Sequence, residues 1–133
     1  MAVKTKLQKK RILIAEDERP MAEALAAKLS HADFETVIAP DGEQALEMLH
    51  SSNCDLLILD IVMPRMNGFK LLEILKNENN KIPVIVLSNL SQEEDIARAK
   101  SLGALDYYIK TDTPLSLITR RVQSILNSDS NPK

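Results

Sequence analysis

The chain has 133 residues, of which 27% are charged and 44% hydrophobic, as expected for one ordinary globular domain with a substantial core. Its net charge of −2 and its two Phe, two Tyr and no Trp disfavour base-stacking modules and give no general attraction to nucleic acid or membranes. Cys54 is the single cysteine, which excludes an internal disulfide and a cysteine-based metal site.

Residues 1–10 form a basic arm that contains four lysines and no apolar stretch. A secretory signal needs an apolar stretch behind its positive charges, and no run in the chain approaches the length of a membrane-spanning helix. We therefore expect a cytoplasmic protein with a solvated arm at residues 1–10, one domain at residues 11–126 and a polar tail at residues 127–133.

Five short apolar runs predict strands. They are Ile12–Ala15, Thr36–Ala39, Leu56–Leu59, Pro83–Leu87 and Asp106–Ile109. Apolar and polar residues do not alternate within these runs, which favours strands that are buried on both faces of a parallel sheet.

Helical periodicity fills the intervals between the runs, and four of the five predicted helices have a clear apolar stripe. In chain order, the stripes are Met21, Leu25 and Leu29; Ala45, Leu46 and Leu49; Leu71, Leu72 and Leu75; and Leu115, Ile118, Val122 and Ile125. Five strand–helix units in series predict an open α/β sandwich with helices on both faces of the sheet.

Capping residues predict where these helices begin and end. Ser91 with Glu94 matches a capping box for the fourth helix, and Gly103 suits the residue after its C-terminus. The other predicted starts are marked by Pro20, Asp41, Gly68 and Thr113-Pro114.

Polar residues that can bind phosphate or metal follow four of the five apolar runs. Glu16 and Asp17 follow the first run, Asp60 the third, Ser88 the fourth and Lys110 the fifth. Ligands of open α/β sheets bind outside the carboxyl ends of the strands. If these strands are neighbours, three carboxylates, a hydroxyl and an ammonium group converge in one crevice.

Such a cluster is suited to binding a metal ion and a phosphoryl group. Carboxylates held close together repel one another and favour a hard cation with oxygen ligands, such as Mg²⁺. One carboxylate can also act as a nucleophile and form an aspartyl phosphate. Mg²⁺, Lys110 and Ser88 would then supply positive charge and a hydrogen bond to the phosphoryl oxygens.

Each residue alone also has a structural explanation. Glu16 and Asp17 suit a helix cap, Asp60 suits the start of a turn, and Lys110 suits a solvated surface position. These explanations do not account for the joint placement of the residues at successive strand ends.

Over Arg11 to Leu126 the chain resembles the response-regulator receiver family. The matching stretches are Ile12–Glu18, Ala39–Leu46, Leu56–Gly68, Pro83–Ser88 and Gly103–Lys110. The resemblance implies a flavodoxin-like (βα)5 three-layer sandwich with a parallel five-stranded sheet in the order 2-1-3-4-5.

The same resemblance implies roles for individual residues. Asp60 matches the phosphoacceptor, Ser88 and Lys110 match the residues that contact the phosphoryl group, and Tyr107 matches the aromatic residue whose rotamer reports activation. The implied ligands of Mg²⁺ are Glu16, Asp17, Asp60 and the backbone carbonyl of Val62.

Several positions depart from the family pattern. Glu16 stands where Asp is usual, and Asn89 stands where a small residue is usual. Thr111 replaces a proline that normally follows a cis bond. A non-proline cis bond costs about 2.5–4 kcal/mol, which favours trans, but the sequence alone leaves cis and trans open at Lys110–Thr111. Asp33 replaces a glycine, and Asp accepts a left-handed backbone better than most residues.

We therefore expect a signalling receiver that is phosphorylated by a histidine kinase or phosphotransfer protein and is not an enzyme beyond its own phosphorylation and slow self-dephosphorylation. Its expected partners are a downstream target or output domain, and a second copy through the fourth helix, fifth strand and fifth helix, with no direct nucleic-acid or membrane partner. No output domain follows Leu126, so both a stand-alone receiver and a piece of a longer protein fit the sequence.

Two other classes of protein share part of this residue pattern. Aspartyl-phosphate phosphatases of another fold place a second Asp two residues after the nucleophile, where this chain has Val62. A degenerate receiver, which binds partners without phosphorylation, is disfavoured because every expected acid, hydroxyl and lysine position is filled. Glycines only at positions 42, 68 and 103 exclude a P-loop and a dinucleotide fingerprint.

Overall fold

Five parallel strands form the sheet in the part of the chain described by the computed structural model, residues 9–127. The order across the sheet is β2 (Glu35–Ala39), β1 (Arg11–Ala15), β3 (Leu56–Leu59), β4 (Val84–Ser88) and β5 (Asp106–Ile109). The predicted fold class and strand order are confirmed, and each predicted strand is displaced by one residue at most.

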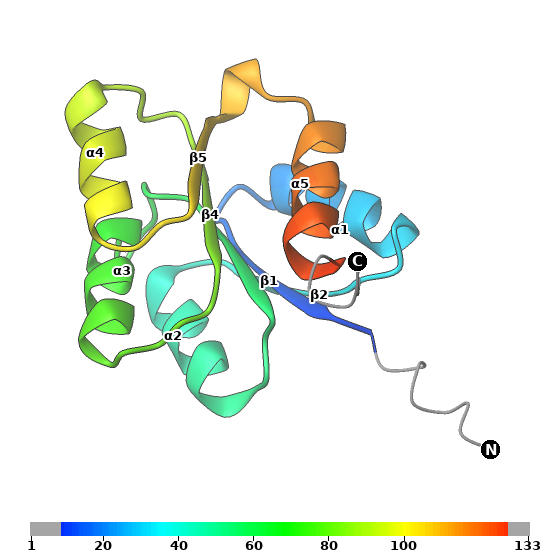
Figure 1. Cartoon of the computed structure of the whole chain (residues 1–133), viewed down its shortest axis with the longest axis horizontal. Coiled ribbons are helices and arrows are strands. Elements are labelled where there is room, and N and C mark those ends of the chain that lie inside the picture. Colours follow the sequence, from blue (N-terminus) through cyan, green and yellow to red (C-terminus); the bar gives the residue numbers. More distant parts are fainter. Residues whose placement is uncertain (1–8, 128–133) are drawn as a thin grey trace.

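Helices cover both faces of this sheet (Figure 1). On one face lie α1 (Arg19–His31) and α5 (Leu115–Asn127), and on the other lie α2 (Gly42–Ser51), α3 (Gly68–Asn77) and α4 (Glu93–Ser101). A short 3-10 turn, Lys110–Asp112, joins β5 to α5. No helix within residues 9–127 is long and apolar enough to cross a membrane.

Two separate hydrophobic cores result, because successive strand residues point to opposite faces. The core beneath α2, α3 and α4 contains Leu13, Leu57, Leu59, Val84 and Val86 from the sheet. The core beneath α1 and α5 contains Ile12, Ile14, Leu56, Ile58, Ile85 and Leu87. Strands β1, β3 and β4 are therefore buried on both faces, as predicted.

The edge strands differ from that prediction. Every residue of β5 is half-buried, and β2 is fully buried only at Ala39. Each of these strands has a hydrogen-bonded neighbour on one side only, which leaves its outer side less covered.

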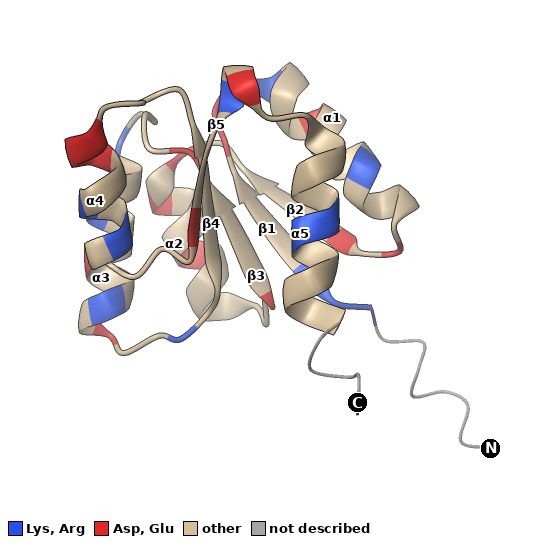
Figure 2. Cartoon of the chain, turned by 45° about the horizontal axis from the view of Figure 1, so that its top comes forward, with Lys and Arg blue, Asp and Glu red and all other residues tan. Residues whose placement is uncertain are grey.

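The predicted capping box of α4 is wrong. Gln92 is the N-cap residue and its side chain makes no cap hydrogen bond, so Ser91 lies one residue too early to cap the helix. Glu93, Glu94 and Asp95 occupy the first turn instead, where their charges favour the positive end of the helix dipole. Figure 2 shows this acidic end and the basic residues further along α4.

The remaining helix predictions are largely confirmed. Asp41 caps α2 by accepting a hydrogen bond from the Gln44 N–H at 2.8 Å. In α5 the fully buried residues are Ile118, Val122 and Leu126, whereas the predicted Leu115 and Ile125 are only partly buried. In α4 the single fully buried residue is Ala99, so few side chains anchor this helix.

Two backbone expectations are confirmed, and the structure answers one question that the sequence left open. Asp33 has a left-handed backbone with φ 76°, and Gly103 follows α4 with φ 109°. Residues 9–127 contain no cis peptide bond, so the bond between Lys110 and Thr111 is trans.

The predicted arm and tail lie mainly outside the described residues, at positions 1–8 and 128–133. Lys9 and Lys10 are exposed, whereas Asn127 is the last residue of α5 and does not belong to a tail.

Gly68 allows α3 to begin directly against the end of β3. Its N–H donates to the Ile61 carbonyl oxygen at 2.8 Å. A Cβ at this position would lie 2.6 Å from the Asp60 carbonyl oxygen and 2.8 Å from the Ile61 Cα. The first turn of α3 therefore fixes the backbone of Asp60, and only glycine fits there.

We expect Gly68→Ala to lower the free energy of unfolding by about 1–3 kcal/mol, because the methyl group must push the backbone of Asp60 and Ile61 away. Urea denaturation measures this change. Lys70→Ala in the same turn is the control, and we expect a change within about 0.5 kcal/mol because Lys70 is exposed. Equal stabilities of the two variants would contradict this account.

Candidate functional site

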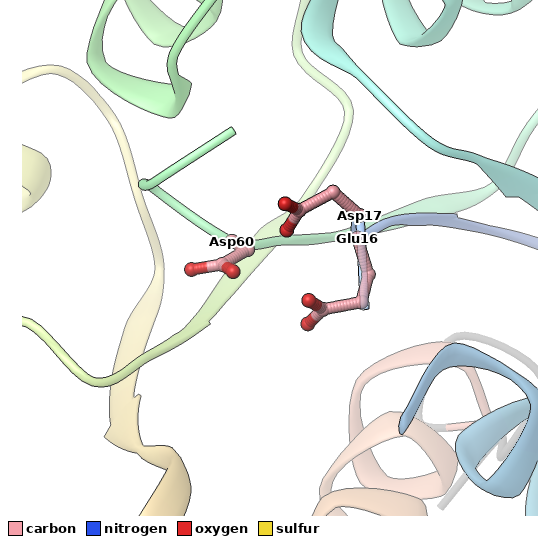
Figure 3. A group of neighbouring side chains, drawn as sticks. All are labelled: Glu16, Asp17 and Asp60. Carbon is pink, nitrogen blue, oxygen red and sulfur yellow. The ribbon is translucent and has the colours of Figure 1, made fainter. Parts of the chain in front are cut away.

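The parallel pairing of β1 with β3 brings three carboxylates to one edge of the sheet. Ala15 pairs with Leu59, so Glu16 and Asp60 leave their strands side by side, and the Asp60 N–H donates to the Ala15 carbonyl oxygen at 3.0 Å. One carboxylate oxygen from each of Glu16, Asp17 and Asp60 lies within 4.8 Å of the other two (Figure 3). This donor set suits a hard divalent cation.

Lys110 lies at the centre of the cluster, where the sequence predicted it. Its ammonium nitrogen is 2.9 Å from Glu16 Oε1, 3.0 Å from Asp60 Oδ2 and 3.1 Å from Glu18 Oε1. The side chain is 8% exposed. Burial alone would lower the pKa of Lys110, but hydrogen bonds to the surrounding carboxylates outweigh burial and raise the pKa, which keeps the ammonium charged.

Glu16 is a buried carboxylate with a raised pKa. Burial raises the pKa of Glu16 to about 7, the hydrogen bond from Lys110 acts against this shift, and the charge of Asp60 adds to it. Its Oε2 also accepts the Glu18 N–H at 3.1 Å, which is not a helix-cap bond because Glu18 is itself the N-cap residue of α1. Three carboxylates contact one ammonium and the carboxylate of Asp17 lies close by, so without a metal ion the cluster carries excess negative charge.

Asp17 differs from its neighbours because it is exposed and has no hydrogen-bond or ion-pair partner within residues 9–127. The N-cap of α1 is Glu18, and no side chain caps that helix. A capping role therefore does not explain Asp17, whose carboxylate is available to a ligand.

Asp60 is 5% exposed and fixed on both oxygens. Oδ2 accepts the hydrogen bond from Lys110, and Oδ1 is 3.4 Å from the Val62 N–H. The Val62 side chain is 59% exposed, the largest exposure of a large apolar residue in the described chain.

Ser88 and Tyr107 meet at the start of the loop between β4 and α4. Ser88 is fully buried, and its Oγ accepts the Leu90 N–H at 3.3 Å. The Tyr107 hydroxyl donates to the Leu90 carbonyl oxygen at 2.7 Å. The pKa of Tyr107 is raised, first by burial. The structure thus links these two residues through the Leu90 backbone, while no hydrogen bond joins Ser88 to Asp60.

Sequence reasoning missed two contributors. Glu18 follows Glu16 and Asp17 in the sequence, but no sequence pattern indicates that it binds Lys110. Asp41 was seen only as a helix cap, yet its Oδ2 also accepts a hydrogen bond from Arg65 Nε at 3.0 Å.

A doubly wound sheet with this acidic cluster and lysine defines a class of phosphoryl-binding signalling domains. The family model of the response regulator receiver domain matches residues 12–121, and the chain belongs to this family. Phosphorylation-based signalling is the general function of the family, and its members bind Mg²⁺ at the acidic pocket.

Related sequences and solved structures agree with this family assignment. The chain is 42% identical over 117 residues to "Regulator of RpoS" of Escherichia coli K12, an alignment that covers 88% of this chain and 35% of that protein. It also aligns with 52% of a probable transcriptional regulator, ycf27, of Cyanophora paradoxa, at 35% identity over 95% of this chain. The chain therefore spans about a third to a half of the length of these relatives.

The structure is similar to the receiver domain of the Francisella response regulator 1452, with a TM-score of 0.85 and 30% identity, over 92% of this chain and 100% of that one. It is also similar to the response regulator TrrA of Thermotoga maritima in complex with Mg²⁺ and BeF, with a TM-score of 0.78 and 29% identity, over 88% of this chain and 99% of that one.

We expect Asp17→Asn to raise the melting temperature of the metal-free protein, because it removes one repelling charge without breaking a contact. The same variant should reduce the rise in melting temperature that Mg²⁺ causes in the wild type. Differential scanning calorimetry with and without Mg²⁺ measures both effects. Glu47→Gln, an exposed change on α2, is the control, and a metal-free Asp17→Asn protein less stable than the wild type would disprove the crowding argument.

Proposed function

We propose that this chain is a phosphorylation-dependent receiver in which Asp60 accepts a phosphoryl group from a histidine kinase or phosphotransfer protein. The observation that carries this proposal is the position of the Asp60 carboxylate. It is buried, bound to the Lys110 ammonium at 3.0 Å, and within 4.8 Å of the carboxylates of Glu16 and Asp17. A cytoplasmic location fits such a partner.

The acidic cluster supports Mg²⁺ as the cofactor. Glu16, Asp17 and Asp60 would hold the ion together with the backbone carbonyl of Val62, and all these ligand atoms are oxygens. When bound, Mg²⁺ supplies positive charge that neutralises the phosphoryl oxygens.

The chain's own residues account for the rest of the transfer. An oxygen of Asp60 forms the new bond to phosphorus as the bond from phosphorus to the donor's imidazole nitrogen breaks, and the imidazole leaves with the electron pair. Lys110 offers its ammonium to the phosphoryl oxygens and remains tethered by Glu16 and Glu18. The backbone contacts at Gly68 hold Asp60 in place during transfer.

The Leu90 backbone contacts both Ser88 and Tyr107. These contacts support the idea that a change at the site alters a partner surface. A phosphoryl group adds acceptor oxygens that attract the Ser88 hydroxyl, which now accepts the Leu90 N–H. Movement of Ser88 shifts the Leu90 backbone, which also holds the Tyr107 hydroxyl. The surface formed by α4, β5 and α5 would change in this way and present itself to a downstream target, an output domain or a second copy.

The alternative is a degenerate receiver that binds partners without phosphorylation. The filled and buried positions of Glu16, Asp60, Ser88 and Lys110 count against it, since unused carboxylates buried together would only reduce stability. A phosphatase reaction lacks its acid, because Val62 stands where that acid is needed.

Asp60→Asn should abolish covalent modification by acetyl phosphate and binding of beryllofluoride in the presence of Mg²⁺, because the amide is not a nucleophile. Intact-protein mass spectrometry detects the phosphoryl adduct. Asp112→Asn, an exposed change close to Lys110, is the matched control and should be modified like the wild type. Undiminished modification of the Asp60→Asn variant would refute the assignment and favour the degenerate receiver or another acceptor.

The phosphorylated state should be long-lived, because Val62 and Leu90 offer no side-chain hydrogen bond to orient a hydrolytic water. Their places, two residues beyond Asp60 and Ser88, flank the approach of that water in the family. Val62→Asn and Leu90→Glu should each accelerate loss of the phosphoryl group from purified protein, and Val62→Ile should not. A lifetime of seconds that none of these changes alters would show that the two positions do not control water access.

A further inference from the structure

The loop from Ile61 to Asn67 connects β3 to α3 and closes back on its own start. The Gly68 N–H donates to the Ile61 carbonyl oxygen at 2.8 Å. Near the start of the loop, the Val62 N–H lies 3.4 Å from Asp60 Oδ1. The conformation of this loop therefore sets one hydrogen bond to the proposed phosphoacceptor and also fixes Val62, whose carbonyl is a proposed metal ligand.

The middle of the loop is held from outside by the start of α2. Asp41 is 1% exposed, and its Oδ2 accepts a hydrogen bond from Arg65 Nε at 3.0 Å. The contact joins residues that are 24 positions apart in the sequence. Next to it, a Cβ on Gly42 would lie 2.1 Å from the Met66 carbonyl oxygen, so these two backbones approach as closely as glycine allows.

Arg65 needs this support because its backbone is left-handed, with φ 69°. A long side chain adopts that region at a cost, and such a conformation persists only where surrounding contacts enforce it. The contact between the Arg65 guanidinium and the Asp41 carboxylate stabilises this conformation, because it joins the strained residue to the buried start of α2.

Capping of α2 does not by itself explain the buried charge of Asp41. The cap is made by Oδ1 with the Gln44 N–H at 2.8 Å, and an asparagine caps a helix about as well as an aspartate. The second oxygen binds the Gln44 side chain at 3.0 Å and Arg65. The negative charge of Asp41 is needed only for the contact with Arg65, which indicates that it serves to hold the loop.

We propose that Asp41 is a positioning residue for the Asp60 site: through Arg65 it holds the loop from Ile61 to Asn67 in the conformation that places Val62 beside Asp60. This inference rests on the proposed function, because the loop matters through its proposed contacts with the metal and the phosphoacceptor. The side chain of Arg65 is 62% exposed, so its contact with Asp41 is weak in terms of global stability. Its loss changes the loop much more than the fold.

Asp41→Asn and Arg65→Gln test the proposal, because the first keeps the helix cap and both remove the charge pair. Each variant should bind Mg²⁺ about tenfold more weakly by isothermal titration calorimetry, the lower end of the effect of residues that orient metal ligands. The double variant should bind no more weakly than either single variant, because both changes break one contact. The amide signal of Val62 in two-dimensional NMR spectra should shift in all three.

Two further variants separate positioning from folding. Arg65→Gly removes the contact but accepts the left-handed backbone, so it should weaken Mg²⁺ binding without loss of thermal stability. Glu35→Gln breaks the 2.8 Å ion pair with Arg11, which joins the first residues of β2 and β1 at the edge of the sheet opposite the site. This variant should leave both Mg²⁺ affinity and the Val62 signal unchanged.

Wild-type Mg²⁺ affinity in Asp41→Asn, Arg65→Gln and Arg65→Gly would overturn the proposal. Asp17→Asn is measured in the same titration so that failure of the Asp41 proposal can be told apart from failure of the proposed function. If Asp17→Asn weakens Mg²⁺ binding and the Asp41 and Arg65 variants do not, only the role of Asp41 is wrong. If the wild type binds no Mg²⁺, both proposals are overturned.

Discussion

The ammonium of Lys110 is the interaction on which the site depends. Carboxylates from the ends of β1 and β3 can lie buried together only because this single cation lies among them. Strand β4 separates β3 from β5, so Lys110 reaches Asp60 across the end of β4, where the strand ends at the small residue Ser88. The parallel strand order thus brings Lys110 and Asp60 to the same edge of the sheet.

The same ion pair leaves the site electrically unbalanced. Lys110 binds Glu16, Glu18 and Asp60 but not Asp17, and the raised pKa of Glu16 reflects its burial in this crowded environment. Selection for fold stability alone would not retain such an arrangement, because unmatched like charges reduce stability. A bound divalent cation would balance this excess negative charge, which fits the Mg²⁺ that members of the family bind at the acidic pocket.

The sequence predicts the sheet and the strand-end residues well because both follow from local patterns. Unbroken apolar runs mark β1, β3 and β4, and the polar residue that follows each strand is carried to the same edge by the parallel pairing. Contacts set by tertiary geometry are not visible in such patterns. The Asp41–Arg65 contact joins two distant loops, and no propensity predicts a left-handed arginine. The capping box failed for a related reason, since a shift of one residue in where α4 begins moves Ser91 out of register.

Helix α4 contributes only Ala99 as a fully buried residue, and its other positions face solvent or are partly covered. Most of its surface can therefore change without a cost to the core. If α4 belongs to the partner surface, as proposed, changes on its exposed positions can alter partner choice without touching the carboxylates at the ends of β1 and β3. The weak anchoring of one short helix would then let duplicated copies of such a domain diverge in their partners while the acidic site stays the same.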